Sequence, residues 1–131
     1  MNNIEMMAEL VRLMEHFQLH PRFLSEIQTL LKKDLKGKEA IFFKQLTTQL
    51  NNVRQFGLNV YKTDSNELLH GADGHYVSLH LKAKQFNVRL IVYIDDTDTP
   101  FFLCAFNERA GKKNTDYSSY TSVMGERLED F

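Results

Sequence analysis

The sequence contains one cysteine, two prolines and no tryptophan among its 131 residues. A single cysteine excludes a disulfide framework within the chain and favours a reducing, cytoplasmic setting. Cys104 lies inside the apolar run FFLCAF. A buried thiol in apolar surroundings stays protonated, so we expect Cys104 to pack in the core and not to act as a nucleophile.

Long apolar runs and a strong net charge are also absent. No apolar stretch approaches the roughly 20 residues that span a bilayer. The N-terminus MNNIEMMAEL carries acids early, where a secretion signal would be basic and then apolar. We therefore expect a cytoplasmic protein with no membrane partner. The net charge of −1 excludes a protein that coats nucleic acid nonspecifically, so any nucleic-acid role requires a local patch.

Several sequence motifs that would identify an enzyme class are missing. There is no phosphate-binding glycine motif, no nucleophile elbow and no dinucleotide fingerprint. His16, His20, His70 and His75 form no metal-ligand spacing with Cys104. We therefore predict no metal site and no cofactor.

The composition, with 43% hydrophobic and 25% charged residues, is typical of a protein with one globular domain. Spacings of three and four in the first half predict three amphipathic helices. The first covers about residues 1–20, stops near Pro21, and has an apolar stripe of Ile4, Met7, Val11, Met14 and Phe17 with Leu10 beside it. The second follows Pro21. The third runs from about Glu39 to Phe56, with Gly57 at its C-terminal capping position.

The second half has the period of two that is typical of strands. A short strand is predicted at Leu58 to Tyr61. Two long strands, residues 76–82 and 87–94, form a predicted hairpin, and the doubly apolar run 101–106 is expected in the middle of the sheet. Residues 116–130 predict a closing helix. The fold class is therefore α+β, with a sheet of three to four strands in which three sequential strands form an antiparallel meander, N-terminal helices against its apolar face, and a short C-terminal helix.

Six residues of the two long strands are predicted to share one solvent-facing surface, because alternate residues of a strand point to the same face. They are Tyr76, Ser78, His80, Lys82, Arg89 and Tyr93. Between His75 and Ile94 the chain has three lysines and arginines and no carboxylate. The pattern thus predicts a basic and aromatic patch.

Such a patch suits cleavage of RNA by its own 2′-hydroxyl. That reaction needs a group to remove the 2′-proton, a group to protonate the departing 5′-oxygen, and cations beside the phosphorane. His80 is the candidate acid or base, and Lys82 and Arg89 are the candidate electrostatic stabilisers.

The other residues of the patch are candidate RNA contacts. Tyr76 and Tyr93 could stack on unpaired bases, and Ser78 and Arg109 are further candidate contacts. Lys112 and Lys113 could approach a phosphate if their loop folds over the sheet. The alternative is that lysine, arginine, serine and histidine line an exposed sheet face for solubility alone.

The order of several segments resembles a known family. These segments are LLHGADGHYVSLHLK, NVRLIVYI and PFFLCAFNERAGKKNTDY, preceded by helices and followed by a final helix. Together they resemble the RelE/ParE superfamily of bacterial toxins, in its HigB-like and phage-derived branch. The resemblance covers roughly residues 23–128, within one toxin domain (residues 1–131) that carries an additional N-terminal helix over residues 1–20.

The resemblance implies helices on one face of a twisted antiparallel sheet. It also implies a messenger-RNA interferase that cuts codons in the ribosomal A site without a metal and is held inactive by a small cognate antitoxin, here expected to be a helix-turn-helix protein. His80 and Lys82 match basic positions of the first long strand, and Arg89 matches the arginine of the next. Arg109, Lys112 and Lys113 fall in a segment that is often rich in lysine.

The chain departs from the family pattern at Glu108, where lysine is common, in its lower positive charge, and in its extra first helix. Three functions remain open: a ribosome-dependent endoribonuclease, a gyrase-inhibiting toxin that is not an enzyme, and a phage-derived interaction protein without toxicity.

Overall fold

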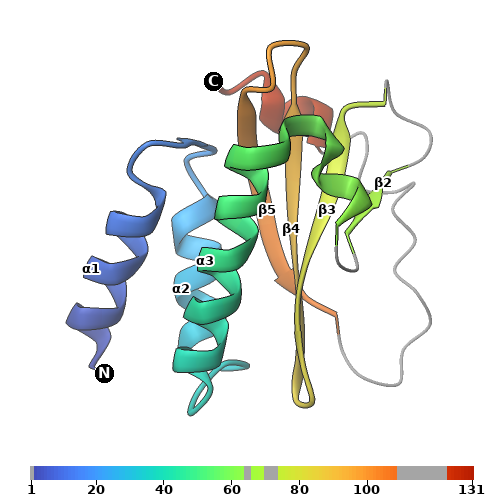
Figure 1. Ribbon diagram of the computed structural model, residues 1–131. Helices are drawn as coiled ribbons and strands as arrows, with labels where there is room; N and C mark the ends of the chain where they lie inside the picture. Colours follow the sequence, from blue (N-terminus) through green and yellow to red (C-terminus); the bar gives the residue numbers. More distant parts are fainter. Residues whose placement is uncertain (1, 64–65, 70–73, 109–123) are drawn as a thin grey trace.

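The computed structural model describes residues 2–63, 66–69, 74–108 and 124–131 (Figure 1). The described elements follow one another in the order α1 (Asn3–Met14), β1 (Gln18–Leu19), α2 (Phe23–Lys32), α3 (Glu39–Phe56), the 3-10 helix η1 (Gly57–Lys62), β2 (Glu67–Leu68), β3 (Tyr76–Ala83), β4 (Phe86–Ile94) and β5 (Pro100–Asn107). Residues 124–128 are helical. The chain is therefore α+β, as predicted.

The sheet has five strands in the order β1-β5-β4-β3-β2, so the expectation of three to four strands was too low. β3, β4 and β5 form the predicted antiparallel meander, and β2 pairs antiparallel with β3. The β3–β4 hairpin is in register from Tyr76 opposite Tyr93 to Ala83 opposite Phe86. β1 pairs parallel with β5, which makes the sheet mixed. Two short strands, β1 and β2, thus lie at the two edges of the sheet, on either side of the three strands that the sequence predicts.

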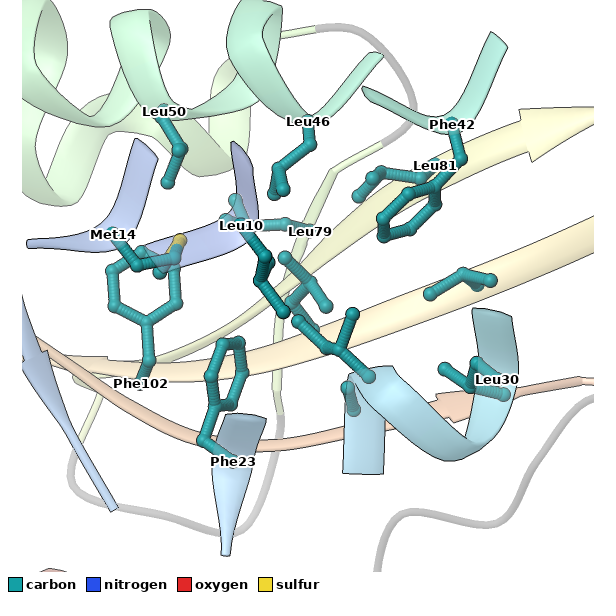
Figure 2. Close-up of a cluster of buried hydrophobic side chains, with 14 of the residues drawn as sticks. Leu10, Met14, Phe23, Leu30, Phe42, Leu46, Leu50, Leu79, Leu81 and Phe102 are labelled. Atoms are coloured by element: carbon teal, nitrogen blue, oxygen red, sulfur yellow. The ribbon is translucent and has the colours of Figure 1, made fainter. Parts of the chain in front are cut away.

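The three helices pack on one face of this sheet (Figure 1). Leucines and phenylalanines from α1, α2 and α3 meet the inward side chains of the strands, including Leu79, Leu81 and Phe102 (Figure 2). The predicted inward set of β3 and β4 is buried as expected: Val77, Leu79, Leu81, Val88, Leu90, Val92 and Ile94. Strand alternation therefore identified the core face correctly.

Helix α1 differs from its prediction at one end and on one face. A capping box starts it, in which Asn2 Oδ1 accepts the Glu5 N–H at 2.8 Å. It ends at Met14 instead of near Pro21, because the chain then extends to pair β1 with β5. Of the predicted stripe, Ile4 and Val11 are exposed, whereas Met14 and the neighbouring Leu10 are buried as expected, together with Met6. Met6, Leu10 and Met14 also have helical spacing, so the pattern did not determine which side of the helix would be covered.

The strand predicted at Leu58 to Tyr61 is wrong, since these residues lie in η1. Helix α3 ends at the predicted cap, where Gly57 has φ +55°. The Leu58 N–H then donates to Asp98 Oδ1 at 3.0 Å, and a Cβ at position 57 would lie 2.4 Å from the Asp98 carboxylate. This close approach turns the chain into η1 and requires glycine.

The second face of the sheet is covered at one end. We call this face, opposite α1, α2 and α3, the outer face. A second apolar cluster lies on it, formed by Leu69, Tyr76, Ile91, Leu103, Cys104 and Met124, and we call it the apolar end. Of the predicted closing-helix residues, Met124 and Leu128 take part in this packing, while Tyr120 and Val123 lie outside the described residues. No helix in the described ranges is long and apolar enough to cross a membrane.

Candidate functional site

The predicted shared face exists, but only part of it faces solvent. Tyr76 and Ser78 are buried, with relative exposures of 7% and 0%. The prediction that all six residues form a solvent-facing surface is therefore wrong for these two. Met124 and Leu69 pack in the cluster that contains Tyr76, and the strand pattern alone carries no information about this cover.

Tyr93 is half-buried in a row of aromatic rings. Its ring lies 5.0 Å from the Tyr76 ring, 5.4 Å from the His75 ring and 6.4 Å from the Phe101 ring, measured between centroids. Phe101 in turn meets Phe131 edge to face at 5.1 Å. The predicted base-stacking tyrosines thus stack mainly on other side chains of this protein.

The opposite end of the outer face carries charge. We call it the charged end, and it consists of Glu67, His80, Arg89 and Glu108. His80 lies directly across from Arg89 in the β3–β4 register. Arg89 Nε donates to Glu108 Oε2 at 2.6 Å, and Arg89 Nη1 donates to Glu67 Oε1 at 3.2 Å. The same Nη1 contacts the His80 imidazole, whose Nε2 lies 3.5 Å from Glu67 Oε1.

Four strand segments bring these groups together. Glu67 is on β2, which pairs with β3 at Ser78, and Glu108 directly follows β5. The His80, Arg89 and Glu108 side chains are only 9%, 11% and 9% exposed, whereas the Glu67 side chain is 47% exposed. An incoming molecule would therefore meet Glu67 first.

The pKa of His80 is lowered to about 4, first by burial and then by the positive charges of Arg89 and Lys82, against an opposing effect of Glu108. The imidazole is thus neutral at pH 7. Counting Arg89 and the two glutamates in their ordinary ionised forms, the charged end has one positive and two negative groups. The expectation of a basic patch is wrong for the described residues of this end.

The sequence interpretation missed both carboxylates for the same reason. The window from His75 to Ile94 has none, and the two glutamates reach this face from outside it through strand pairing. Glu108 was noted only as a departure from the family pattern. The two-residue strand that carries Glu67 is too short for a period of two to show.

Lys82 is exposed at the end of β3, on the same face as His80. Within the described ranges it takes part in no ion pair with a carboxylate. It is therefore the predicted site residue that is open to an anionic ligand. Arg109, Lys112 and Lys113 lie outside the described residues.

Cys104 packs as predicted. It is buried, its Sγ lies 3.6 Å from Met124 Sδ, and burial raises the pKa of its thiol to about 12. In the part of the chain that the structure describes, no group of three or more histidine, cysteine, aspartate or glutamate residues is placed to hold a metal ion.

Another histidine joins the two ends of the chain. His20 is 5% exposed, and its Nδ1 accepts the Arg22 N–H at 3.1 Å. Its Nε2 then donates to Asp130 at 2.7 Å. Because both ring nitrogens are engaged in this way, His20 holds the C-terminus in place and is not a candidate for catalysis.

Comparison of the chain with protein-family models, curated proteins and solved structures gives no match.

Proposed function

We propose that this protein is a toxin of a type II toxin-antitoxin system that cleaves messenger RNA on the ribosome without a metal. One observation carries the proposal: a glutamate, a histidine and an arginine from three neighbouring strands meet within 3.5 Å, and the glutamate is half exposed. RNA cleavage by the 2′-hydroxyl requires a base, an acid and a cation. The resemblance of the segment order to RelE/ParE toxins supports the same reaction.

In the proposed reaction, Glu67 is the base. The scissile phosphate approaches Arg89 and displaces the Glu67 carboxylate, which is the more exposed of its two partners. The freed carboxylate takes the proton of the 2′-hydroxyl. The 2′-oxygen then attacks phosphorus, and the bond to the 5′-oxygen breaks to leave a 2′,3′-cyclic phosphate.

His80 is the acid in this reaction. An anionic phosphate beside an imidazole favours its charged form, so substrate binding raises the pKa of His80 from its low value in the free protein. The imidazolium gives its proton to the departing 5′-oxygen. Arg89 remains beside the phosphorane, while Lys82 attracts the RNA backbone from the rim of the face.

The test is expression from a tight promoter in a bacterium, followed within minutes by sequencing of RNA ends that carry a 5′-hydroxyl. The wild type is expected to produce new, codon-phased ends. Glu67→Gln removes the proposed base with little change in shape and is expected to lower the yield of these ends at least 100-fold.

Glu15→Gln is a matched control. The Glu15 side chain is 55% exposed and lies 3.3 Å from a histidine, His16, which makes it similar to Glu67 in both respects. It is remote from the charged end and should leave the new ends unchanged. Equal yields from both variants would refute the role of Glu67, and the absence of new ends in the wild type would refute the nuclease.

A second function is a binding protein that retains this fold without cleaving RNA. The observation that favours it is the complete pairing of Arg89 by two carboxylates, which is also typical of a structural ion network. This function predicts no new RNA ends from any variant. If growth still arrests, a protein target such as gyrase becomes the leading explanation.

For the nuclease we propose the ribosome and messenger RNA as partners, and a small helix-turn-helix antitoxin as the inhibitor. Co-expression with the product of a neighbouring open reading frame should restore growth if that product is the antitoxin.

A further inference from the structure

The edge of β3 beyond Ser78 is occupied by amide side chains instead of a strand. β2 pairs only with Val77 and Ser78 within the described ranges. Past that point, Asn66 Oδ1 accepts the His80 N–H at 2.9 Å, and Gln49 Nε2 donates to the His80 carbonyl at 2.9 Å. Helix α3 therefore lies along a strand edge that another strand cannot reach without displacing these bonds.

A pocket of about 450 Å³ lies between α3 and this edge. Its α3 wall contains Ile41, Lys44, Gln45 and Thr48, whose spacing of three and four places them on one side of the helix. Lys82 of β3 lies on the opposite wall. None of the α3 residues was singled out from the sequence, because the pocket forms only when helix and strand are brought together.

The charge of this pocket is unbalanced. Lys44 and Lys82 both line it and are both exposed, and no lining residue is a carboxylate. Among the ion pairs of the described residues, neither lysine has a partner. Two ammonium groups that face one space attract an anion, and phosphate is the anion whose size and charge suit two lysines.

Gln45 joins the two walls of the pocket. Its Nε2 donates to the Lys82 carbonyl at 2.5 Å, which fixes the orientation of the amide. Ile41, which also lines the pocket, is 50% exposed and offers an apolar surface.

We propose that this pocket binds a nucleotide, with its phosphate between Lys44 and Lys82 and its base or ribose against Ile41. The volume is within the range of about 300 to 1,000 Å³ typical of small-molecule sites. A nucleotide provides an anion and an apolar ring face in one molecule. In the cell this nucleotide is one unit of the RNA substrate, whose chain then continues over Lys82 toward the charged end. That identification rests on the proposed function, whereas the binding of a nucleotide as such does not.

The experiment measures binding directly and uses two probes on the full chain. Nucleoside monophosphates are titrated by NMR, and a labelled oligoribonucleotide of eight units is titrated by fluorescence anisotropy at several salt concentrations. Lys44→Ala and Lys82→Ala are each expected to weaken both ligands about two- to fivefold. For the oligonucleotide, each is also expected to reduce the slope of log affinity against log salt by about 0.7. Lys44→Arg should restore most of the loss.

Lys32→Ala is the control of equal charge. Lys32 is exposed on α2 and lines a small separate pocket against α1, so its replacement should not change either titration. Thermal unfolding of each variant shows that the fold is retained. Equal effects of Lys44→Ala and Lys32→Ala would overturn the proposal, as would inorganic phosphate that binds as tightly as the monophosphates, or no binding of either probe.

The outcomes for RNA and for free nucleotide are distinguishable. If monophosphates bind at Lys44 but no RNA is cleaved in cells, the pocket stands and the nuclease fails. If RNA is cleaved but Lys44→Ala changes neither binding nor cleavage, the nuclease stands and the pocket fails.

Discussion

The two ends of the outer sheet face both lie on β3 and β4, yet one is sealed and the other is partly open to solvent. Ile91 is fully buried at the apolar end, while Arg89, two residues earlier on β4, belongs to the charged end. Likewise Tyr76 packs under the cluster of Met124, and His80, four residues later on β3, meets Glu67. Residues of β3 and β4 alternate in the same way at both ends, so what differs on these two strands is the cover.

The cover of the apolar end is tied to the helical layer on the other side of the sheet. Arg127 donates through Nη1 and Nη2 to the two oxygens of Glu26 on α2, both at 2.9 Å, and Nη1 also donates to the Leu103 carbonyl at 2.7 Å. His20 and Asp130 form a second tie. These two contacts hold the C-terminal helix on the apolar end. We therefore expect side chains of the apolar end to contribute mainly to stability, and those of the charged end to contribute mainly to the proposed reaction.

The largest expected effect is at the apolar end. Leu103→Ala removes a fully buried side chain, so the free energy of unfolding should fall by about 3 kcal/mol, from lost burial and the cavity left behind. Urea denaturation measures the change. Ile4→Ala, at a position that is 82% exposed, should cost less than about 0.5 kcal/mol. A loss below about 1 kcal/mol for Leu103→Ala would show that the outer cluster contributes little to the fold.

At the charged end the largest change in stability should come from Arg89→Met. It leaves the Glu108 carboxylate, which is 9% exposed, without its main cation and should cost about 2 kcal/mol at pH 7. Adding Glu108→Gln should recover part of that loss. Arg12→Met is the control, because its pair with Glu9 is exposed and should change the free energy of unfolding much less than Arg89→Met does. No recovery in the double variant would argue against a coupled cluster.

The sequence predicted the elements whose signals are local. Helix α3 and its Gly57 cap follow from apolar spacing and one glycine, and β3, β4 and β5 follow from alternation within each strand. The two-residue β1 and β2 were missed, because each exists only through pairing with a distant strand. The stretch after Gly57 was wrongly predicted as a strand, since its turn depends on Asp98, about 40 residues away.

The same distinction holds for the candidate site. His80 and Arg89 could be placed together from the sequence, because a tight hairpin fixes which residues face each other. The carboxylates of Glu67 and Glu108 change the net charge around this pair. They could not be placed beside it from the sequence, because both glutamates come from outside the hairpin. The burial of Ser78 and Tyr76 also could not be seen, because it depends on cover from outside the hairpin.

The pH dependence of stability sharpens the comparison further. The folded-state pKa of His80 is about 4, below the ordinary value of 6.5, so the unfolded chain binds more protons between these values. The stability that His80 contributes is fully present above about pH 6.5 and is lost as the pH falls toward 4. Because Glu67 keeps this region partly open to water, we expect a loss of about 1 to 2 kcal/mol.

The measurement is urea denaturation of the wild type and of His80→Gln at pH 7, 6, 5 and 4. Other acids titrate in the same range in both proteins, so the difference between the two isolates the imidazole. The advantage of the wild type should shrink steadily below pH 6.5. A constant difference would mean that His80 is not held in its neutral form.

Among the variants of the charged end, Glu67→Gln should have the smallest effect on stability, at about 0.5 kcal/mol, because its side chain is half exposed and Glu108 still holds Arg89. A residue that contributes so little to folding, yet whose loss abolishes RNA cleavage, would mark the charged end as a reaction site. If Glu67→Gln instead destabilises the protein as much as Arg89→Met in the same urea titration, the cluster is a structural ion network. The two ends would then both serve the fold, and the binding protein would be the better account of this chain.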